Sequence, residues 1–258
     1  MGESGFAIEI TEIVKDFRVY HRKFSSIKGL ATAAVRSLMK RSPNTGFETR
    51  RVLNGVTFRV AKGESVALIG RNGSGKSTLL SILSRIYLPT SGEARVSGKL
   101  MSLLELGAGF HPELTGNDNL YFNGIMMGLS DAEVAARYDS ILKFAGLERQ
   151  TLDLPVRMYS SGMQLRLAFS MAVHLDADTI LIDEGLAVGD EAFQERCFKK
   201  IEELHATGHT ILMVTHELDH IERLAHRVIW LDGGRIRMDG DVGEVLAEYR
   251  KVLWEANP

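Results

Sequence analysis

One stretch constrains this chain more than any other: Gly70-Arg71-Asn72-Gly73-Ser74-Gly75-Lys76-Ser77. It fits the pattern G-x-x-x-x-G-K-[ST], follows a short apolar run at 65–69, and opens a segment with helical periodicity. Glycines in such a loop let backbone N–H groups turn inward around phosphate oxygens, and the N-terminus of the next helix adds positive potential. Lys76 would reach the terminal phosphates, and the Ser77 hydroxyl would bind Mg²⁺. The motif predicts a nucleoside-triphosphate site rather than a chance glycine turn.

A second, acidic element follows about a hundred residues later, in the run Ile-Leu-Ile-Asp-Glu at 180–184. Three apolar residues predict a buried strand. Asp183 at its carboxyl end would hold Mg²⁺ through water, and Glu184 can orient or deprotonate the attacking water. The alternative is two ordinary acidic residues at a strand end. The phosphate-binding motif in the same chain favours the catalytic interpretation.

Composition limits the class of protein. The chain has 258 residues, of which 45% are hydrophobic and 25% charged, so it fits one or two globular domains and excludes collagen, disorder and a small disulfide scaffold. No apolar run approaches the ~18 residues of a membrane span. The N-terminus lacks a secretory pattern, and the single Cys197 predicts a structural thiol. We therefore expect a soluble, cytosolic protein.

Charge is distributed unevenly along the chain. Between Phe17 and Phe47 there is no acidic residue, and seven Lys and Arg residues give +7, while the remainder carries 24 basic and 33 acidic residues, or −9. Apolar residues at helical spacing within this stretch, from Phe24 to Leu38, predict a short amphipathic helix. The stretch is either a solvated surface helix or a segment that meets an anionic membrane surface and a membrane partner.

The remaining pattern predicts short buried strands alternating with helices, which indicates an α/β fold with a mostly parallel sheet covered on both faces. We expect strands over 8–13, 52–60, 65–69, 98–105, 179–182, 210–215, 228–232 and 235–238. We expect helices over 76–87, 118–147 with breaks near Gly128 and Gly146, 163–175, 190–206, 217–225 and 241–253.

At Tyr159-Ser160-Ser161-Gly162-Met163 the chain resembles a degenerate form of the signature of ATP-binding-cassette (ABC) ATPases, usually written LSGGQ. The order of phosphate loop, signature and acidic strand is also that of the family. The resemblance covers nearly the whole chain. It implies a single ABC nucleotide-binding domain over 1–258, with a P-loop core sheet, an antiparallel β part, a basic insertion at about 17–50 and a helical signature subdomain at about 107–175.

The resemblance also implies roles for individual residues. ATP and Mg²⁺ would be the cofactors, with ATP held by Phe17 and by the loop from Gly70 to Thr78, and with Mg²⁺ held by Ser77 and Asp183. Two copies of the chain would sandwich two ATP molecules head to tail. The signature residues Ser160, Ser161, Gly162 and Met163 of one copy would then face the γ-phosphate bound by the other, although Ser161 and Met163 depart from the usual glycine and glutamine.

Several further positions match the family. Lys76, Glu184 and His216 would be the catalytic residues, with His216 as the switch histidine after a strand. Asp190 occupies the place of a loop that couples the two sites. The glutamine of another coupling loop falls at Glu105 or Leu106, and the aromatic residue that stacks on adenine is Phe17 or Tyr20.

The departures from the usual motifs resemble one subfamily, the Wzt-like and teichoic-acid-type ATPases of bacterial polysaccharide exporters. This implies an ATPase that powers export of a lipid-linked polysaccharide, O-antigen or a similar glycan. Its partners would be a second copy, an integral membrane transporter subunit, the membrane surface and, indirectly, the glycan, with no nucleic acid. It would be peripheral to the cytoplasmic face of the bacterial inner membrane. The C-terminal carbohydrate-binding domain of some relatives is not expected here.

Three other functions compete with this one. An ABC ATPase of translation or DNA repair usually carries two cassettes or a long coiled coil in one chain, and neither is found here. A P-loop small-molecule kinase leaves the signature and His216 unexplained. An ABC exporter ATPase for another substrate stays open, because fold alone does not fix the cargo.

Overall fold

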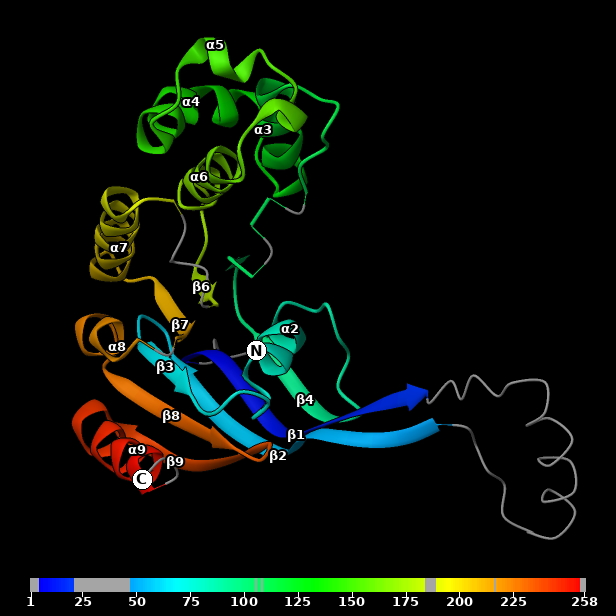
Figure 1. Ribbon diagram of the computed structural model, residues 1–258, viewed down its shortest axis with the longest axis vertical. Helices are drawn as coiled ribbons and strands as arrows, with labels where there is room; N and C mark the ends of the chain where they lie inside the picture. Colours follow the sequence, from blue (N-terminus) through cyan, green and yellow to red (C-terminus); the bar gives the residue numbers. More distant parts are fainter. Residues whose placement is uncertain are drawn as a thin grey trace, which may run out of the picture.

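The computed structural model describes residues 5–20, 47–104, 106–107, 109–183, 189–215 and 217–255. They form two sheets and a group of helices (Figure 1). In chain order the strands are β1 Phe6–Tyr20, β2 Phe47–Ala61, β3 Ser65–Ile69, β4 Ser91–Val96, β5 Leu100–Ser102, β6 Thr179–Ile182, β7 Thr210–Val214, β8 Arg227–Asp232 and β9 Arg235–Asp241. The helices are α2 Lys76–Leu83, α3 Gly116–Met126, α4 Asp131–Ala145, α5 Arg149–Leu152, the 3-10 helix η1 Val156–Met158, α6 Ser161–Ala172, α7 Glu191–Ala206, α8 Leu218–Leu224 and α9 Val242–Glu255.

The larger sheet has six strands in the order β5-β6-β7-β3-β8-β9. All neighbouring pairs are parallel except the β8–β9 hairpin. Every residue of β3, β6 and β7 is buried, as expected for parallel strands covered on both faces. The structure confirms the expected α/β class with a mostly parallel core sheet.

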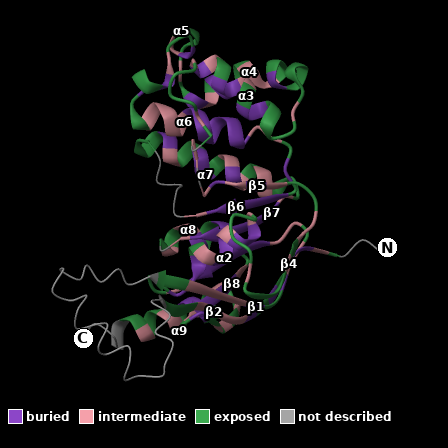
Figure 2. Cartoon of the chain, turned by 90° about the vertical axis from the view of Figure 1, so that its right-hand side faces the viewer, coloured by how far each residue is buried: buried purple, intermediate pink, exposed green. Residues whose placement is uncertain are grey.

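Alternate residues of the core strands belong to two hydrophobic clusters. Ala67 and Ile69 of β3 pack with residues of α6, α7, α8 and α9 on one face of the sheet. Val66 and Leu68 pack with α2, β1 and β2 on the other face. Figure 2 shows the buried residues gathered in the central strands and on the inward sides of the helices. Strand β3, which leads into the phosphate loop, is therefore fixed from both sides.

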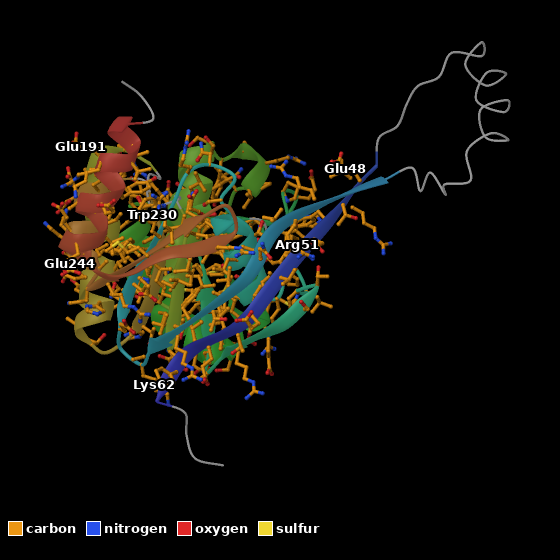
Figure 3. The ribbon with its side chains drawn as sticks, turned by 90° about the horizontal axis from the view of Figure 1, so that it is seen from below. Glu48, Arg51, Lys62, Glu191, Trp230 and Glu244 are labelled. Carbon is orange, nitrogen blue, oxygen red and sulfur yellow. The ribbon has the colours of Figure 1, made fainter. Side chains whose placement is uncertain are left out.

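The smaller sheet is antiparallel, in the order β2-β1-β4. Strands β1 and β2 pair along their whole length, from Phe6 with Ala61 to Tyr20 with Phe47, and Figure 3 shows them running side by side to the end marked by Glu48. Across this hairpin the Arg51 guanidinium donates to both carboxylate oxygens of Asp16, at 2.8 and 3.0 Å, and these hydrogen bonds lower the pKa of Asp16.

Helices α3 to α6 form a separate helical part with its own hydrophobic cluster. Capping boxes begin α3 and α4, where Thr115 exchanges hydrogen bonds with Asp118 and Ser130 does so with Glu133. Gly146 ends α4 in the left-handed conformation at φ 65°, close to the break expected from the sequence. These helices provide the expected helical part that carries the signature.

Several expected boundaries are corrected by the structure. Residues 17–20 and 47–50 of the expected insertion are paired strand residues, and the expected amphipathic helix at 24–38 lies outside the described residues. Helix α2 ends at Leu83 rather than Tyr87, because Arg85 adopts a left-handed φ of 60°. The strand expected at 98–105 is only Leu100–Ser102. Within the described part of the chain, no helix combines the length and the apolar character that a membrane span requires.

Candidate functional site: a phosphate loop and a signature helix

The phosphate loop joins β3 to α2 and is closely enclosed by residues of β8 and β2. A Cβ atom on Gly70 would lie 2.1 Å from the carbonyl oxygen of Leu231, at the end of β8. A Cβ atom on Gly75, which has a φ of 110°, would lie 2.6 Å from Cδ2 of Leu53 in β2. Only glycine fits at either position. Leu231 and Leu53 lie outside the sequence motif, so the motif alone does not predict that they enclose the loop.

Lys76 is buried although it carries a charge. Its Nζ donates hydrogen bonds to the carbonyl oxygens of Gly70 at 2.8 Å and Arg71 at 3.3 Å. The ammonium group thus folds back across the loop from the first turn of α2. The structure brings together the cation and the loop that the motif predicts.

Two features of the loop suit a bound phosphate. The Ser74 hydroxyl is buried and has no hydrogen-bond partner among the described residues. Gly75 is the N-cap of α2 and offers no side-chain cap, so the backbone N–H groups at this end of the helix can donate hydrogen bonds to an anion. Of the other loop residues, Arg71, Asn72, Gly73 and Ser77 are exposed and Thr78 is half-buried.

Sheet register places the other predicted groups at the same edge. Leu68 of β3 pairs with Val214 of β7, and Met213 of β7 pairs with Ile182 of β6. The segments that follow these strands therefore emerge together, and they hold the phosphate loop, Thr215 and Asp183. Glu184 and His216 belong to the same segments in sequence but lie outside the described residues.

A magnesium ion needs oxygen ligands, and Ser77 and Asp183 offer a hydroxyl and a carboxylate. Within the described ranges, no group of three or more His, Cys, Asp or Glu side chains forms a metal site of its own.

The expected adenine-stacking residue, Phe17, lies on β1 and is half-buried. Its ring meets Tyr87 edge to face, with the centroids 5.4 Å apart, and the Nζ atom of Lys15 lies 4.9 Å from its centroid. Lys15 also donates to the Leu88 carbonyl at 2.7 Å, which holds it there. Tyr87 was not singled out by the sequence. The side chain of Tyr20, the alternative to Phe17, lies outside the described part.

The signature residues begin α6. Ser160 is the N-cap, and its hydroxyl accepts a hydrogen bond from the Met163 N–H at 3.2 Å. Ser160 and Ser161 are exposed, and Gly162 and Met163 are half-buried. Among the described residues, a Cβ atom on Gly162 would meet only the Ser160 hydroxyl, at 3.9 Å. The preceding Tyr159, where the usual motif has leucine, is buried and donates to the Thr151 carbonyl at 2.7 Å; burial raises its pKa to about 12. Tyr159 thus fixes the start of the signature helix to the helical core.

Of the two residues expected in coupling loops, the structure describes Asp190 but not Glu105. Asp190 is the N-cap of α7 and accepts a hydrogen bond from the Phe193 N–H at 2.9 Å, and it forms an ion pair with Arg166 of α6. Glu105 lies outside the described residues, whereas its alternative, Leu106, packs against the hydrophobic cluster that contains Phe193. The link between Arg166 and Asp190 was missed by the sequence analysis, since the two residues are far apart along the chain.

Comparison with known protein families identifies the family to which this chain belongs. A family described as ABC transporter matches residues 53–187, from β2 to the segment after β6 and more than half of the chain. The chain belongs to the ABC transporter family. Its ATPase fold and the order of its motifs agree with this membership.

Similar proteins of the ABC family include two O-antigen export system ATP-binding proteins named RfbB. The one from Myxococcus xanthus is 43% identical over 255 residues, which cover 98% of this chain and 57% of the relative. The one from Klebsiella pneumoniae is 40% identical over 248 residues, which cover 95% of this chain and 98% of the relative. A solved structure, described as the ATP binding subunit of an ABC transporter, superposes with a TM-score of 0.73 at 24% identity, covering 94% of this chain and 93% of that one. This ABC chain therefore spans little more than half of one relative and nearly all of another.

Proposed function

We propose that this chain is the ATP-hydrolysing subunit that powers export of a lipid-linked polysaccharide, such as O-antigen, through a separate membrane subunit. The observation that carries the proposal is the match to the Klebsiella O-antigen export protein, which extends over 95% of this chain and 98% of the relative. An enclosed phosphate loop with a buried cationic Lys76 supports the ATPase part of it.

In this proposal each part of the nucleotide site has one task. The loop N–H groups and Lys76 hold the phosphates, and Ser77 and Asp183 hold Mg²⁺, which when bound neutralises charge on the phosphate oxygens. Glu184 orients and deprotonates the attacking water, and His216 contacts the γ-phosphate. Phe17 stacks on adenine.

A complete site then requires two copies of the chain. The signature starts a helix of the helical part, and its first residues Ser160 and Ser161 are exposed. A helix N-terminus with exposed serine residues suits an anion presented by another molecule. The γ-phosphate held by a second copy is that anion in the proposed homodimer.

Helix α3 carries a candidate binding site for the membrane subunit. Phe122 and Ile125 are each 50% exposed and Met126 is 72% exposed, and their spacing places them on one face of the helix. Apolar side chains gathered on a surface mark an interaction site. We assign this face to a cytoplasmic segment of the membrane subunit, and we propose that the chain lies at the cytoplasmic face of the membrane. The basic residues between 17 and 47 then offer cations to the anionic leaflet.

The proposal is tested in cells that lack the chain but keep the glycan-synthesis enzymes. Wild type should restore surface glycan and co-purify with a polytopic membrane protein, and the purified complex should hydrolyse ATP. Lys76→Ala should abolish glycan export and ATP hydrolysis, because it removes the positive charge that holds the phosphates. Lys99→Ala changes an exposed lysine outside the phosphate loop and should leave both activities intact.

Each other outcome has its own meaning. ATP hydrolysis without a membrane partner would favour an ABC ATPase that is not coupled to transport. Co-purification with a membrane protein but normal surface glycan in the absence of the chain would favour an exporter of another substrate.

A further inference from the structure

The turn of the β8–β9 hairpin touches the phosphate loop, although the two are about 160 residues apart in sequence. The Gly234 N–H donates a hydrogen bond to the Ser74 carbonyl at 3.1 Å. The Gly234 carbonyl in turn accepts one from the Asn54 N–H of β2, at 2.8 Å. Gly234 therefore links the phosphate loop to β2 through its backbone alone.

The hydrogen bond to Ser74 sets the direction of a neighbouring amide. A peptide unit is planar and trans, so its C=O and N–H point in opposite directions. The Ser74 carbonyl and the Gly75 N–H belong to one such unit. Because the carbonyl is turned toward Gly234, the Gly75 N–H is turned away from the hairpin, at the N-terminus of α2, where an anion is favoured.

Close packing leaves no room for a side chain on Gly234. It has a φ of 76°, and a Cβ atom there would lie 2.3 Å from the Val52 carbonyl oxygen. The adjacent Gly233 also has a positive φ, 54°, but a Cβ atom on it would meet no described residue within 4 Å. The two glycines thus share a positive φ and differ in the space available for a Cβ atom.

We propose that Gly234 is a positioning residue for phosphate binding: its N–H holds the Ser74–Gly75 peptide so that the Gly75 N–H points at the bound phosphate. Gly234 acts through Gly75 and need not touch the nucleotide. The inference rests on the proposed function, since it assumes that the loop binds ATP.

The test compares Gly234→Ala with Gly233→Ala in the full chain, using ATP for turnover and ADP for binding. Gly234→Ala should raise the KM for ATP and the Kd for ADP about tenfold or more, as expected when one hydrogen bond to a charged group is lost. Its kcat at saturating ATP should stay within about threefold, because the groups assigned to the chemistry are unchanged. Gly233→Ala should match wild type in all three quantities.

General destabilisation needs its own control. Val245 is fully buried in α9, and Val245→Ala removes core contacts on the far side of the sheet from β2. It should lower the melting temperature but leave the ADP Kd unchanged. If Gly234→Ala binds ADP as tightly as wild type, or no more weakly than Val245→Ala, the inference is wrong.

A measurement on wild type covers the case in which Gly234→Ala does not fold. In protein labelled with ¹⁵N-glycine, saturating ADP should shift the amide resonances of Gly75 and Gly234 and slow hydrogen exchange at Gly234, while Gly233 stays unchanged. A shift at Gly75 with no change at Gly234 would overturn the inference and keep the proposed function. If neither resonance responds because wild type does not bind ADP, the proposed function fails as well.

Discussion

The Asp190 carboxylate joins two helices that carry different parts of the proposed site. One oxygen caps α7 by accepting the Phe193 N–H, and the other is hydrogen-bonded to the guanidinium of Arg166 in the signature helix. Arg166 also lies over the Phe193 ring, 5.3 Å from its centroid. The start of α7 and the signature helix are therefore tied together, so a shift of one is transmitted to the other.

Substitutions at Asp190 should separate its two contacts. Asp190→Asn keeps a good helix cap but loses the charge that pairs with Arg166, whereas Asp190→Ala loses both and should cost about 1 kcal/mol of stability. We expect both variants to lower the ATPase rate without changing the Kd for ADP, since neither contact involves the phosphate loop. Steady-state ATPase assays and ADP titration measure the rate and the Kd, and urea unfolding measures the loss of stability. Asp176→Asn, at an exposed carboxylate, is the matched control. An ATPase rate equal to wild type in Asp190→Asn would show that the ion pair has no part in coupling.

Glu184→Gln should bind ATP but hydrolyse it about 10²–10⁴-fold more slowly, because loss of a general base has that effect. The ligands proposed for phosphate and Mg²⁺ remain, so the variant should accumulate as an ATP-bound dimer in size-exclusion chromatography. Lys76→Ala, by contrast, should stay monomeric at the same ATP concentration. A hydrolysis rate for Glu184→Gln within a few-fold of wild type would contradict the assignment.

The signature should act on the nucleotide of the other copy. Gly162→Asp has room for its side chain and adds an acidic residue to the first turn of α6, where helices tolerate it, so the protein should fold. The same charge would repel a γ-phosphate, so its homodimer should be inactive. A mixture of Gly162→Asp and Lys76→Ala chains should recover part of the activity, because one composite site of each heterodimer is intact. Steady-state ATPase assays over a range of mixing ratios check this.

The exposed face of α3 should be needed for assembly and not for ATP binding. Met126→Asp together with Phe122→Asp places two charges where an apolar partner is proposed, so co-purification of the membrane subunit should fall at least about tenfold. The isolated chain should keep its ADP Kd. Leu253→Asp, at another exposed apolar residue on α9, is the control and should leave assembly intact. Normal complex formation by the double variant would exclude this face as the binding site for the membrane subunit.

Cys197 should be unreactive in the native protein. Burial raises the pKa of its thiol to about 12, so at pH 8 the folded chain holds almost no thiolate. The folded pKa lies above the unfolded value, so stability should fall as the pH rises from the unfolded thiol pKa, about 8.5, toward 12. A thiol reagent at pH 8 should label Cys197 only when urea unfolds the chain. Rapid labelling without denaturant would contradict the buried position.

Much of the fold could be predicted from the sequence because the core strands are unambiguous. Ser65–Ile69 and Thr179–Ile182 are short apolar runs between glycine or polar residues, and both strands have the expected bounds. The phosphate loop and Asp183 directly follow these strands, so their place at the C-terminal ends of the strands could be predicted as well. The Ser160 cap was not predicted, because the signature helix was expected to begin at Met163 and begins at Ser161.

Features that depend on tertiary contacts could not be predicted. Strand β4, Ser91–Val96, has an exposed or half-buried residue at every position and alternates only at its end, where Ala94 and Val96 pack against the core, so its pairing with β1 is what defines it as a strand. Gly233-Gly234 lies between the two strands expected at 228–232 and 235–238, but the contact of Gly234 with Ser74 depends on how β8 packs beside β3. The same holds for Arg166 and Asp190.

The long β1–β2 hairpin has a consequence for protein engineering. Its strands remain paired out to Tyr20 and Phe47, so whatever connects them starts and ends at two positions held side by side. Closing a longer connection costs little, about 0.6 kcal/mol for each doubling of its length. A fluorescent reporter can therefore be inserted between these residues while the core sheet keeps its register.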